Sequence, residues 1–337
     1  MAVLYITSDR PAAGKTALAG ALAAGLSGVG RGVGYIKPFS ASPQDDPDVA
    51  FIARTILLDE NGAPQQATLP MPEGMAEGQP LAESMARELA QSIECIAATR
   101  ETVLVEGPDI SLSGSATLAD HLGGTVLLVI CYEPGLSAER VIQACQPFGQ
   151  RLLGVLINSV TRYREREVRQ GLVSAIESRG VKCLGAIPED RLMASVTVGQ
   201  IAQHLDGHWV LGEEKAHDLV ENFLIGGNIM DSGLTYFGRM ENKAVIVRGD
   251  RPDIQLAALS SPTTCLILTG GHEPIQYVYH QAEQEEVPLL VVPADTISAA
   301  HALDAALEAS TVHHPGKLER FRELTEEHVD VAAIQAL

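Results

Sequence analysis

The segment that most constrains the fold is Thr-Ser-Asp-Arg-Pro-Ala-Ala-Gly-Lys-Thr at residues 7–16. It follows an apolar run, residues 3–7, and leads into a helical pattern, residues 16–26. A Gly-Lys-Thr triplet between a strand and a helix offers backbone amides to an anion, a lysine to terminal phosphates and a hydroxyl to magnesium. The segment therefore predicts a phosphate-binding loop for a nucleoside triphosphate, with ATP and Mg²⁺ as the first choice. The alternative is a chance triplet, because Asp9 stands where the strict motif has a glycine.

Short apolar runs alternate with helical patterns through the first two-thirds of the chain. The runs are rich in Val, Ile and Leu and lack a polar face, as strands buried on both sides of a parallel sheet do. This alternation predicts an α/β fold with a doubly wound, mostly parallel sheet of the P-loop NTPase kind. The predicted strands are residues 3–7, 32–36, 102–106, 125–131, 153–158 and 182–187, and the predicted helices are residues 16–26, 81–98, 137–145 and 165–179.

The strand and helix pattern restarts near Pro188, which predicts a second, smaller α/β domain. We place the first domain at residues 1–190 and the second at residues 191–337, which includes a charged helical tail from Lys317. Residues 58–80 are rich in Pro and Gly and predict either a long surface loop or lid, or a disordered excursion. The second domain has predicted strands at residues 243–247, 265–269 and 288–292, and predicted helices at residues 197–205, 215–223, 252–259, 274–284 and 298–307.

Charge and composition exclude several classes of partner. The formal net charge is −19, and glutamates interrupt the one basic cluster, residues 162–169. Nucleic acids and anionic membranes attract clustered Lys and Arg, so we expect neither as a partner. No apolar run is long enough to span a bilayer, and no signal pattern precedes the first strand. Five scattered cysteines without a CxxC pair indicate reduced thiols, so we expect a soluble cytoplasmic protein.

Charged residues close several of the predicted strands and are candidates for binding metal and phosphate. Glu106 ends the strand at residues 102–106, and an acidic stretch that includes Asp48 follows the strand at residues 32–36. The carboxyl edge of an open α/β sheet is where ligands bind, and carboxylates are the oxygen ligands that Mg²⁺ prefers. Lys37 ends its strand and can approach phosphate from the side opposite Lys15. The alternatives are a helix cap for the glutamate, a turn for the acidic stretch and a surface position for Lys37.

Together these motifs resemble the dethiobiotin synthetase group of P-loop proteins, which includes the related N-terminal domain of phosphotransacetylases. The loop at residues 7–16 is similar to the group's TGTDTxVGKT, and Gly-Tyr-Ile-Lys-Pro at residues 34–38 is similar to its GYKP. Val-Leu-Val-Glu-Gly at residues 103–107 is similar to the start of VLVEGAGG. Ile-Asn-Ser at residues 157–159 and Leu-Gly-Ala-Ile-Pro at residues 184–188 are similar to the later ND and LGxIP motifs. The resemblance covers about residues 1–190.

By position, the resemblance implies roles for individual residues. Lys15 and Lys37 would be catalytic lysines beside the phosphates, and Thr16, Asp48 and Glu106 would bind Mg²⁺. An Asn amide both donates and accepts, which suits an adenine edge, although without the resemblance Asn158 is equally a turn residue. The implied nucleotide-binding positions are Ala13, Gly14, Lys15, Thr16, Ala17, Asn158 and Pro188.

The second region resembles the DRTGG domain, which occurs beside this P-loop domain in phosphotransacetylases. The matching residues are Gly-Asp-Arg-Pro-Asp at 249–253, Leu-Thr-Gly-Gly at 268–271, Pro274 and Asp295-Thr296. Glycines at the end of a strand can offer amides to an anion, and an Asp-Arg pair can hold a ligand or form an ion pair. The resemblance implies a ligand-sensing or dimerising module, with a simple glycine turn as the alternative. Its ligand candidates are Asp250, Arg251, Thr269, Gly270 and Gly271.

Three functions fit these features. The first is a MgATP-binding regulatory or ligand-sensing protein, and we expect no acetyltransferase catalytic domain before the chain ends at Leu337. The second is an ATP-dependent ligase that phosphorylates a carboxylate, as dethiobiotin and cobyrinic acid a,c-diamide synthetases do, with the acid near residues 39–42 and 108–111. The residues Pro108-Asp109-Ile110 replace the group's glycine-rich turn, which argues against dethiobiotin synthesis. The third is a partner of a separate acetyltransferase or other metabolic enzyme. We prefer the first, and by analogy we expect a homodimer.

Overall fold

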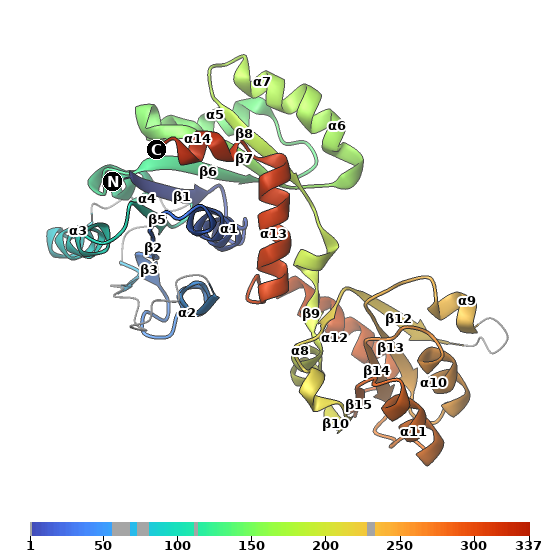
Figure 1. The fold of residues 1–337 in the computed structure, drawn as a ribbon. Helices are drawn as coiled ribbons and strands as arrows, with labels where there is room; N and C mark the ends of the chain where they lie inside the picture. Colours follow the sequence, from blue (N-terminus) through green and yellow to red (C-terminus); the bar gives the residue numbers. More distant parts are fainter. Residues whose placement is uncertain (1, 56–67, 73–80, 111–113, 228–232) are drawn as a thin grey trace. The chain divides into compact units, whose positions relative to one another are not determined.

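The computed structural model describes residues 2–55, 68–72, 81–110, 114–227 and 233–337 (Figure 1). It has two compact units, of which the first contains Met1–Glu189 together with Val312–Leu337 and the second contains Asp190–Thr311. The second unit is thus inserted into the chain of the first. This differs from the division expected from the sequence, which placed residues 312–337 in the second domain.

The first unit contains a six-stranded sheet in the order β2-β5-β1-β6-β7-β8, and its strand pairs are parallel. From the central strand β1 the chain moves to β2 on one side and later to β6 on the other. Strand order reverses beside β1, and this is where open α/β sheets bind ligands. The predicted α/β fold with a doubly wound parallel sheet is confirmed. The strands are β1 (Ala2–Ser8), β2 (Val33–Ile36), β5 (Thr102–Glu106), β6 (Thr125–Cys131), β7 (Leu152–Val160) and β8 (Cys183–Pro188).

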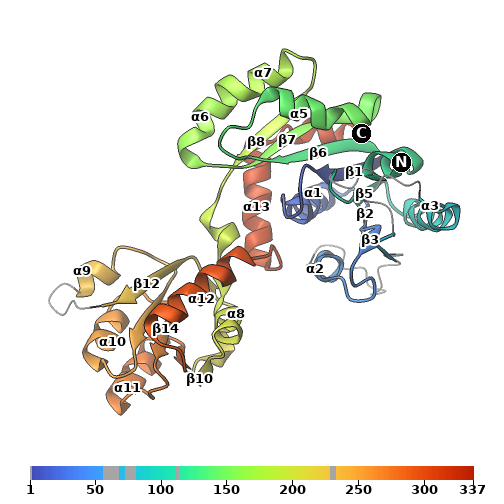
Figure 2. The ribbon, with the colours of Figure 1, turned by 180° about the vertical axis from the view of Figure 1, so that it is seen from behind.

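Helices cover both faces of this sheet. Alternate strand side chains pack in one apolar cluster with α3, α4, α5 and α7, because successive side chains of a strand point to opposite faces. Helices α1 and α13 lie side by side on the other face (Figures 1 and 2). The helices are α1 (Lys15–Gly28), α2 (Pro47–Thr55), α3 (Glu83–Ala97), α4 (Gly114–His121), α5 (Ala138–Cys145), α6 (Glu165–Glu167), α7 (Ser174–Glu177), α13 (Pro315–His328) and α14 (Val331–Gln335).

The first unit also contains an irregular helix and a pair of short strands. A π-helical segment, Val168–Val173, joins α6 to α7, so the helix predicted at residues 165–179 is continuous but irregular. The short strands β3 (Phe39–Ser40) and β4 (Leu69–Pro70) pair with each other. Apart from residues 68–72, the loop or lid predicted at residues 58–80 lies outside the described residues.

The returning segment, residues 312–337, is anchored to the edge of the first sheet. The amide of Asp330 donates to the carbonyl oxygen of Leu184 on β8 at 2.7 Å. A β-carbon on Gly185 would lie 2.1 Å from the carbonyl oxygen of His328, so only glycine permits this close approach. The segment that follows the second unit is therefore a structural part of the first.

The second unit contains a five-stranded sheet in the order β10-β15-β14-β13-β12, in which β10 is antiparallel to β15 and the other pairs are parallel. Two separate apolar clusters fill its two faces, one with α8 and α12 and the other with α9, α10 and α11. The strands are β9 (Val196–Thr197), β10 (His208–Leu211), β11 (Leu219–Val220), β12 (Asn222–Gly226), β13 (Lys243–Arg248), β14 (Cys265–Thr269) and β15 (Leu289–Val292). The helices are α8 (Val198–His204), α9 (Gly233–Phe237), α10 (Pro252–Leu259), α11 (Gln276–Gln284) and α12 (Thr296–Glu308).

The helix predicted at residues 215–223 is wrong. Its residues contain β11 and the start of β12, which pair with β9 and β13 respectively. Backbone hydrogen bonds to strands that are distant in sequence decide the conformation here, and the local spacing of apolar residues does not reveal them. Within the described parts of the chain, no helix combines the length and apolar character needed to cross a membrane.

Candidate functional site

The loop between β1 and α1 is shaped for the close approach of an anion. Gly14 lies in the left-handed region with φ of 94°, and Lys15 begins the helix directly after it. The first amides of a helix have no carbonyl partner within it, and a glycine at the N-cap adds no side chain over them. The loop therefore presents amides and the positive end of the α1 dipole at the carboxyl edge of the sheet.

Asp9, which departs from the strict motif, ties this loop to β6. Its amide donates to the carbonyl oxygen of Val129 at 3.0 Å, and its Oδ1 accepts from the amide of Cys131 at 2.9 Å. Arg10 forms ion pairs with Asp9 at 3.0 Å and with Glu133 at 2.9 Å. Side-chain hydrogen bonds of the aspartate thus hold the start of the loop where the strict motif has a glycine.

Lys15 and Thr16 meet two residues from neighbouring strands at this edge. The Nζ atom of Lys15 donates to Ser8 Oγ at 2.9 Å, and Thr16 Oγ1 donates to Glu106 Oε1 at 2.8 Å. The other carboxylate oxygen of Glu106 accepts from the hydroxyl of Tyr35 at 2.7 Å. The structure therefore brings Lys15, Thr16 and Glu106 together. Tyr35 was not among the predicted site residues, although it lies two residues before Lys37 in the Gly-Tyr-Ile-Lys-Pro motif.

Burial shifts the titration of the charged groups at this edge. It raises the pKa of the Glu106 carboxyl, and the nearby charge of Asp48 adds to the rise, against hydrogen bonds from Tyr35 and Thr16 that oppose it. Burial also lowers the pKa of Lys15. Both shifts mean that these charges are held partly out of water, where each interacts more strongly with an opposite charge.

A second charged cluster lies just beyond the end of β2. Lys37 Nζ lies 2.8 Å from Asp46 Oδ2 and 2.5 Å from Asp48 Oδ2. Asp46 Oδ1 accepts from the amides of Asp48 and Val49, so Asp46 caps α2, with Pro47 as the first helical residue. The acidic stretch thus begins in a turn, in which the amide of Asp45 donates to the carbonyl oxygen of Ser42 at 3.1 Å, and continues as the start of a helix.

His313, from the returning segment, completes this cluster. Its Nε2 lies 2.7 Å from Asp48 Oδ1, and its ring packs against that of Phe51 with centroids 5.4 Å apart. Burial alone would raise the pKa of Asp48, but the hydrogen bonds of His313 and Lys37 outweigh it and lower the pKa to about 2. His313 was not predicted as a site residue, because nothing in its sequence neighbourhood indicates a contact with a residue so far away along the chain.

The remaining predicted nucleotide-binding residues lie on or beside the loop. Asn158 is buried in β7, and its Nδ2 donates to the carbonyl oxygen of Ala13 at 2.9 Å. A β-carbon on Gly14 would lie 2.5 Å from that same nitrogen. Ala17 is buried in α1, and Pro188 ends β8. Asn158 thus supports the loop in this structure, and its role toward adenine stays a prediction.

The oxygen atoms at this edge suit a hard cation whose remaining coordination positions are filled by phosphate and water. They comprise the hydroxyl of Thr16 and the carboxylates of Glu106 and Asp48. In the described residues, no group of three or more His, Cys, Asp or Glu side chains is arranged to hold a metal by itself. Mg²⁺ ordinarily keeps several waters and binds one or two carboxylates together with substrate phosphates. The donor set therefore fits Mg²⁺ bound together with a phosphate, and the assignment of individual ligands stays a prediction.

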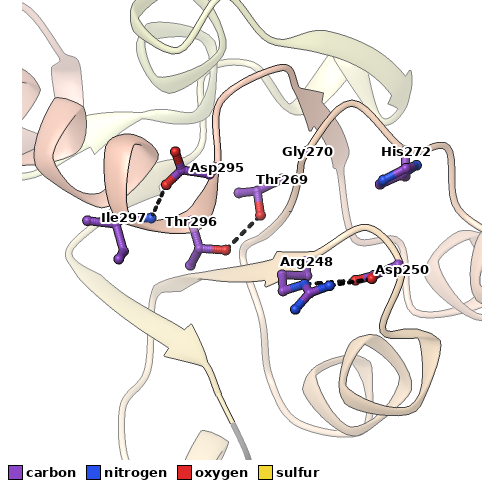
Figure 3. A pocket seen from close by; sticks show the side chains of 8 residues that line it. All are labelled: Arg248, Asp250, Thr269, Gly270, His272, Asp295, Thr296 and Ile297. Carbon is purple, nitrogen blue, oxygen red and sulfur yellow. Dashed lines mark hydrogen bonds and ion pairs between the residues drawn. The ribbon is translucent and has the colours of Figure 1, made fainter.

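The second unit has a pocket of about 380 Å³ at the carboxyl ends of its strands (Figure 3). Asp250 pairs with Arg248, with Oδ1 2.9 Å from Nε, and the hydroxyls of Thr269 and Thr296 lie 2.8 Å apart. Asp295 accepts from two amides at the start of α12 and so caps that helix. The residues that line the pocket are Arg248, Asp250, Thr269, Gly270, His272, Asp295, Thr296 and Ile297.

Three of the five predicted ligand candidates, Asp250, Thr269 and Gly270, line this pocket. Asp250 and Arg251 do not pair with each other, because Arg251 pairs with Asp253 at 2.8 Å. The amides of Gly270 and Gly271 donate to carbonyl oxygens of the β15 strand and the loop that follows it, each at 2.9 Å. In this structure these amides serve the turn, so they are not directed at an anion as the sequence suggested.

Family models match most of the chain. A model described as an AAA domain matches residues 2–197, and a DRTGG domain model matches residues 200–306. Together they confirm the predicted combination of a P-loop domain with a DRTGG domain.

Solved structures similar to this chain include MinD cell division protein from Aquifex aeolicus, with 17% identity and a TM-score of 0.39 over 56% of this chain and 83% of that one. Another is cobyrinic acid a,c-diamide synthase from Mycobacterium smegmatis with a bound ATP analogue and magnesium, with 15% identity and a TM-score of 0.36 over 57% and 88%. A third holds the CBS and DRTGG domains of the regulatory region of Clostridium perfringens pyrophosphatase complexed with diadenosine tetraphosphate, with 16% identity and a TM-score of 0.31 over 53% and 73%. Likeness at this level carries no conclusion about function.

Proposed function

We propose that this chain, which belongs to the AAA domain family and carries a DRTGG domain, binds ATP with Mg²⁺ in its first unit and senses another ligand in its second. One observation carries the proposal, namely the 2.8 Å hydrogen bond between Thr16 Oγ1 and Glu106 Oε1 at the start of α1. It joins a hydroxyl and a carboxylate beside Lys15 at the positive end of a helix dipole. Phosphate and its metal need these groups at this position.

Each residue of the edge then has a role toward the nucleotide. The loop amides and Lys15 hold the phosphates, Lys37 approaches them from the other side, and Asn158 and Pro188 flank the adenine. Thr16, Asp48 and Glu106 hold the metal together with water. Bound Mg²⁺ supplies positive charge that offsets the charge of the phosphates. The burial that lowers the pKa of Lys15 also strengthens its attraction to an anion.

Two contacts favour sensing over the ligase alternative. Ser40, at the position where an acid substrate would lie, is buried and donates its hydroxyl to Asp46 at 2.6 Å. Asp109, at the other such position, is only 9% exposed and interacts electrostatically with Lys15. A carboxylate substrate at these positions would meet buried negative charge, which disfavours its binding.

The second unit supports a sensing role because it has its own pocket and its own apolar cores. A pocket of about 380 Å³ falls within the range of small-molecule sites, which is roughly 300–1,000 Å³. Both ends of this unit connect to the first, so a ligand that restrains the unit can act on both connections. On the family resemblance we also propose a homodimer, a cytoplasmic location and a metabolic enzyme, such as an acetyltransferase, as partner.

Calorimetric titration tests the nucleotide proposal. ATP, ADP, GTP and CTP are titrated into the full chain, each with Mg²⁺ and again with EDTA. We expect ATP to bind in a Mg²⁺-dependent way, and Lys15→Ala to weaken it at least about tenfold, because a charged hydrogen bond contributes about 1.5–3 kcal/mol. Lys215→Ala, in the second unit, is the control and should leave binding unchanged. If wild-type protein binds none of the four nucleotides, the proposal is wrong.

Phosphate release separates sensing from ligation. We expect release from MgATP to be slow and unchanged across a panel of carboxylic acids. If one acid stimulated release strongly, the ligase alternative would replace the sensing role while nucleotide binding would stand.

A further inference from the structure

The contact between His313 and Asp48 joins two residues that lie 265 positions apart in the sequence. Asp48 lies in the first turn of α2, and His313 lies two residues after Thr311, the last residue of the second unit. Their side chains are each 22% exposed, and the Nε2–Oδ1 distance is 2.7 Å. A charged hydrogen bond with little exposure to water is stronger and less screened than one on the open surface.

His313 is held firmly from its own side. The next residue, His314, caps α13 by accepting from the amide of Gly316 at 3.0 Å, and Pro315 occupies the first turn. The ring of His313 also packs against Phe51, one turn along α2 from Asp48. A donor fixed in this way restricts how the Asp48 carboxylate can rotate.

The hydrogen bonds of Asp48 leave room for a metal. Among the residues that the structure describes, Oδ1 takes one hydrogen bond, from His313, and Oδ2 takes one, from Lys37. An ionised carboxylate has about four acceptor sites, so each oxygen keeps one for another partner. Residues that orient a metal-binding carboxylate in this way ordinarily change metal affinity by about 10–100-fold when they are replaced.

We propose that His313 is a positioning residue for the Mg²⁺ site, which makes the metal affinity of the first unit depend on the segment that leaves the second unit. This inference rests on the proposed function, because it assumes that Asp48 faces the metal of a bound MgATP. The segment gives a short route for coupling, since a change in the second unit needs to pass only Val312 to reach His313. Coupling is reciprocal, so metal and nucleotide must in turn restrain the segment.

The test measures the Mg²⁺ concentration that gives half-maximal ATP binding, by calorimetry on the full chain. We expect His313→Ala and His313→Phe to raise this concentration by about 10–100-fold, while ATP binding in EDTA stays unchanged. His313→Gln keeps a nitrogen donor near the Nε2 position and should stay within a few-fold of wild type. His121→Ala, an exposed histidine on α4, is the matched control. Circular dichroism checks that every variant is folded.

The variants separate the hydrogen bond from packing. His313→Phe keeps a ring against Phe51 but has no donor, so near-normal behaviour of this variant with failure of His313→Gln would assign the effect to packing and overturn the inference. Tighter Mg²⁺ binding in His313→Ala would show that the histidine competes with the metal, which also overturns it. Unchanged Mg²⁺ dependence in all variants overturns this inference alone. Absence of any nucleotide binding by wild type overturns the proposed function and the inference with it.

Hydrogen exchange gives a second readout. We expect MgATP to slow amide exchange at residues 308–314 in wild type, and to have no such effect in His313→Ala. Unchanged exchange in wild type under saturating MgATP would contradict the proposed coupling.

Discussion

The carboxyl edges of the two sheets carry similar residue types in different surroundings. In the first unit Lys37 and Asp46 have side chains only 19% and 4% exposed, and they share a network with Asp48. In the second unit Arg248 and Asp250 have side chains 66% and 46% exposed, and they form an ion pair between residues two positions apart in the sequence. Water and salt screen the exposed pair, whereas the buried network keeps its electrostatic strength.

This difference indicates that the first edge is better suited than the second to bind a charged ligand. Holding several charges partly out of water costs stability, and sites that bind charged ligands concentrate such groups. The first edge has this character, with Lys15 and Glu106 both shifted in pKa by burial. The second edge has a pocket of moderate size, and its charges contribute little to holding the unit together.

The largest effect is expected from Lys37→Ala. It removes the cation from between Asp46 and Asp48 and leaves two neighbouring carboxylates without their shared partner. Removal of one partner from a buried ion pair costs about 3–5 kcal/mol. We expect the lower end, roughly 3 kcal/mol from the unfolding free energy of the first unit, because Ser40 and two amides still donate to Asp46. Urea unfolding followed by far-UV circular dichroism measures it.

The protein contains a control for this measurement. Its single tryptophan, Trp209, lies on β10 of the second unit, so tryptophan fluorescence reports that unit alone. Lys37→Ala should leave the fluorescence transition where it is in wild type. If circular dichroism shows that Lys37→Ala lowers the unfolding free energy by less than about 1 kcal/mol, the network is effectively solvated, and the two edges do not differ as we propose.

A pH-dependent effect of intermediate size is expected from Asp48→Asn. The pKa of Asp48 is lowered from 3.8 to about 2, which corresponds to roughly 2 kcal/mol of stability. Because the folded state favours the ionised form, this contribution is complete above about pH 4 and disappears as the pH falls toward 2. In EDTA, we therefore expect wild type to exceed Asp48→Asn in unfolding free energy at pH 6, with the gap closing between pH 4 and pH 2. A gap that is constant with pH would assign the effect to packing.

The smallest effect is expected from Arg248→Ala in the second unit. Its pair with Asp250 is exposed, and exposed pairs add little to stability. We expect the urea transition followed by Trp209 fluorescence to move by no more than the experimental error, in low salt and in high salt alike. A clear destabilisation would show that the second edge is built like the first.

The six strands of the first sheet and the three central strands of the second could be predicted from the sequence because they are short runs of Val, Ile and Leu, and burial on both faces leaves that local signature. The two edge strands of the second sheet, β10 and β12, are less buried, and they were not predicted. The meeting of Lys15, Thr16 and Glu106 follows from the same reasoning, since the ends of neighbouring parallel strands share one edge. Their roles toward ATP and Mg²⁺ remain predictions.

Helix α2 was missed although Asp46-Pro47 is a recognisable helix start, because the acidic stretch was interpreted only as a metal site or a turn.

Features that depend on distant contacts could not be predicted from local sequence patterns. Residues 215–223 became strands through pairing with β9 and β13. His313 reaches Asp48 only because the chain returns to the first unit after the second, and no local pattern carries that information.

Binding of MgATP at the carboxyl edge of the first sheet is tested most directly by a crystal structure of the full chain with a non-hydrolysable ATP analogue and Mg²⁺. We predict phosphates at the start of α1 against Lys15, with a metal about 2.0–2.1 Å from Thr16 Oγ1. We also predict Glu106 and Asp48 beside that metal, with His313 still hydrogen-bonded to Asp48. A nucleotide bound in the pocket of the second unit, with the loop at residues 7–16 empty, would contradict these predictions.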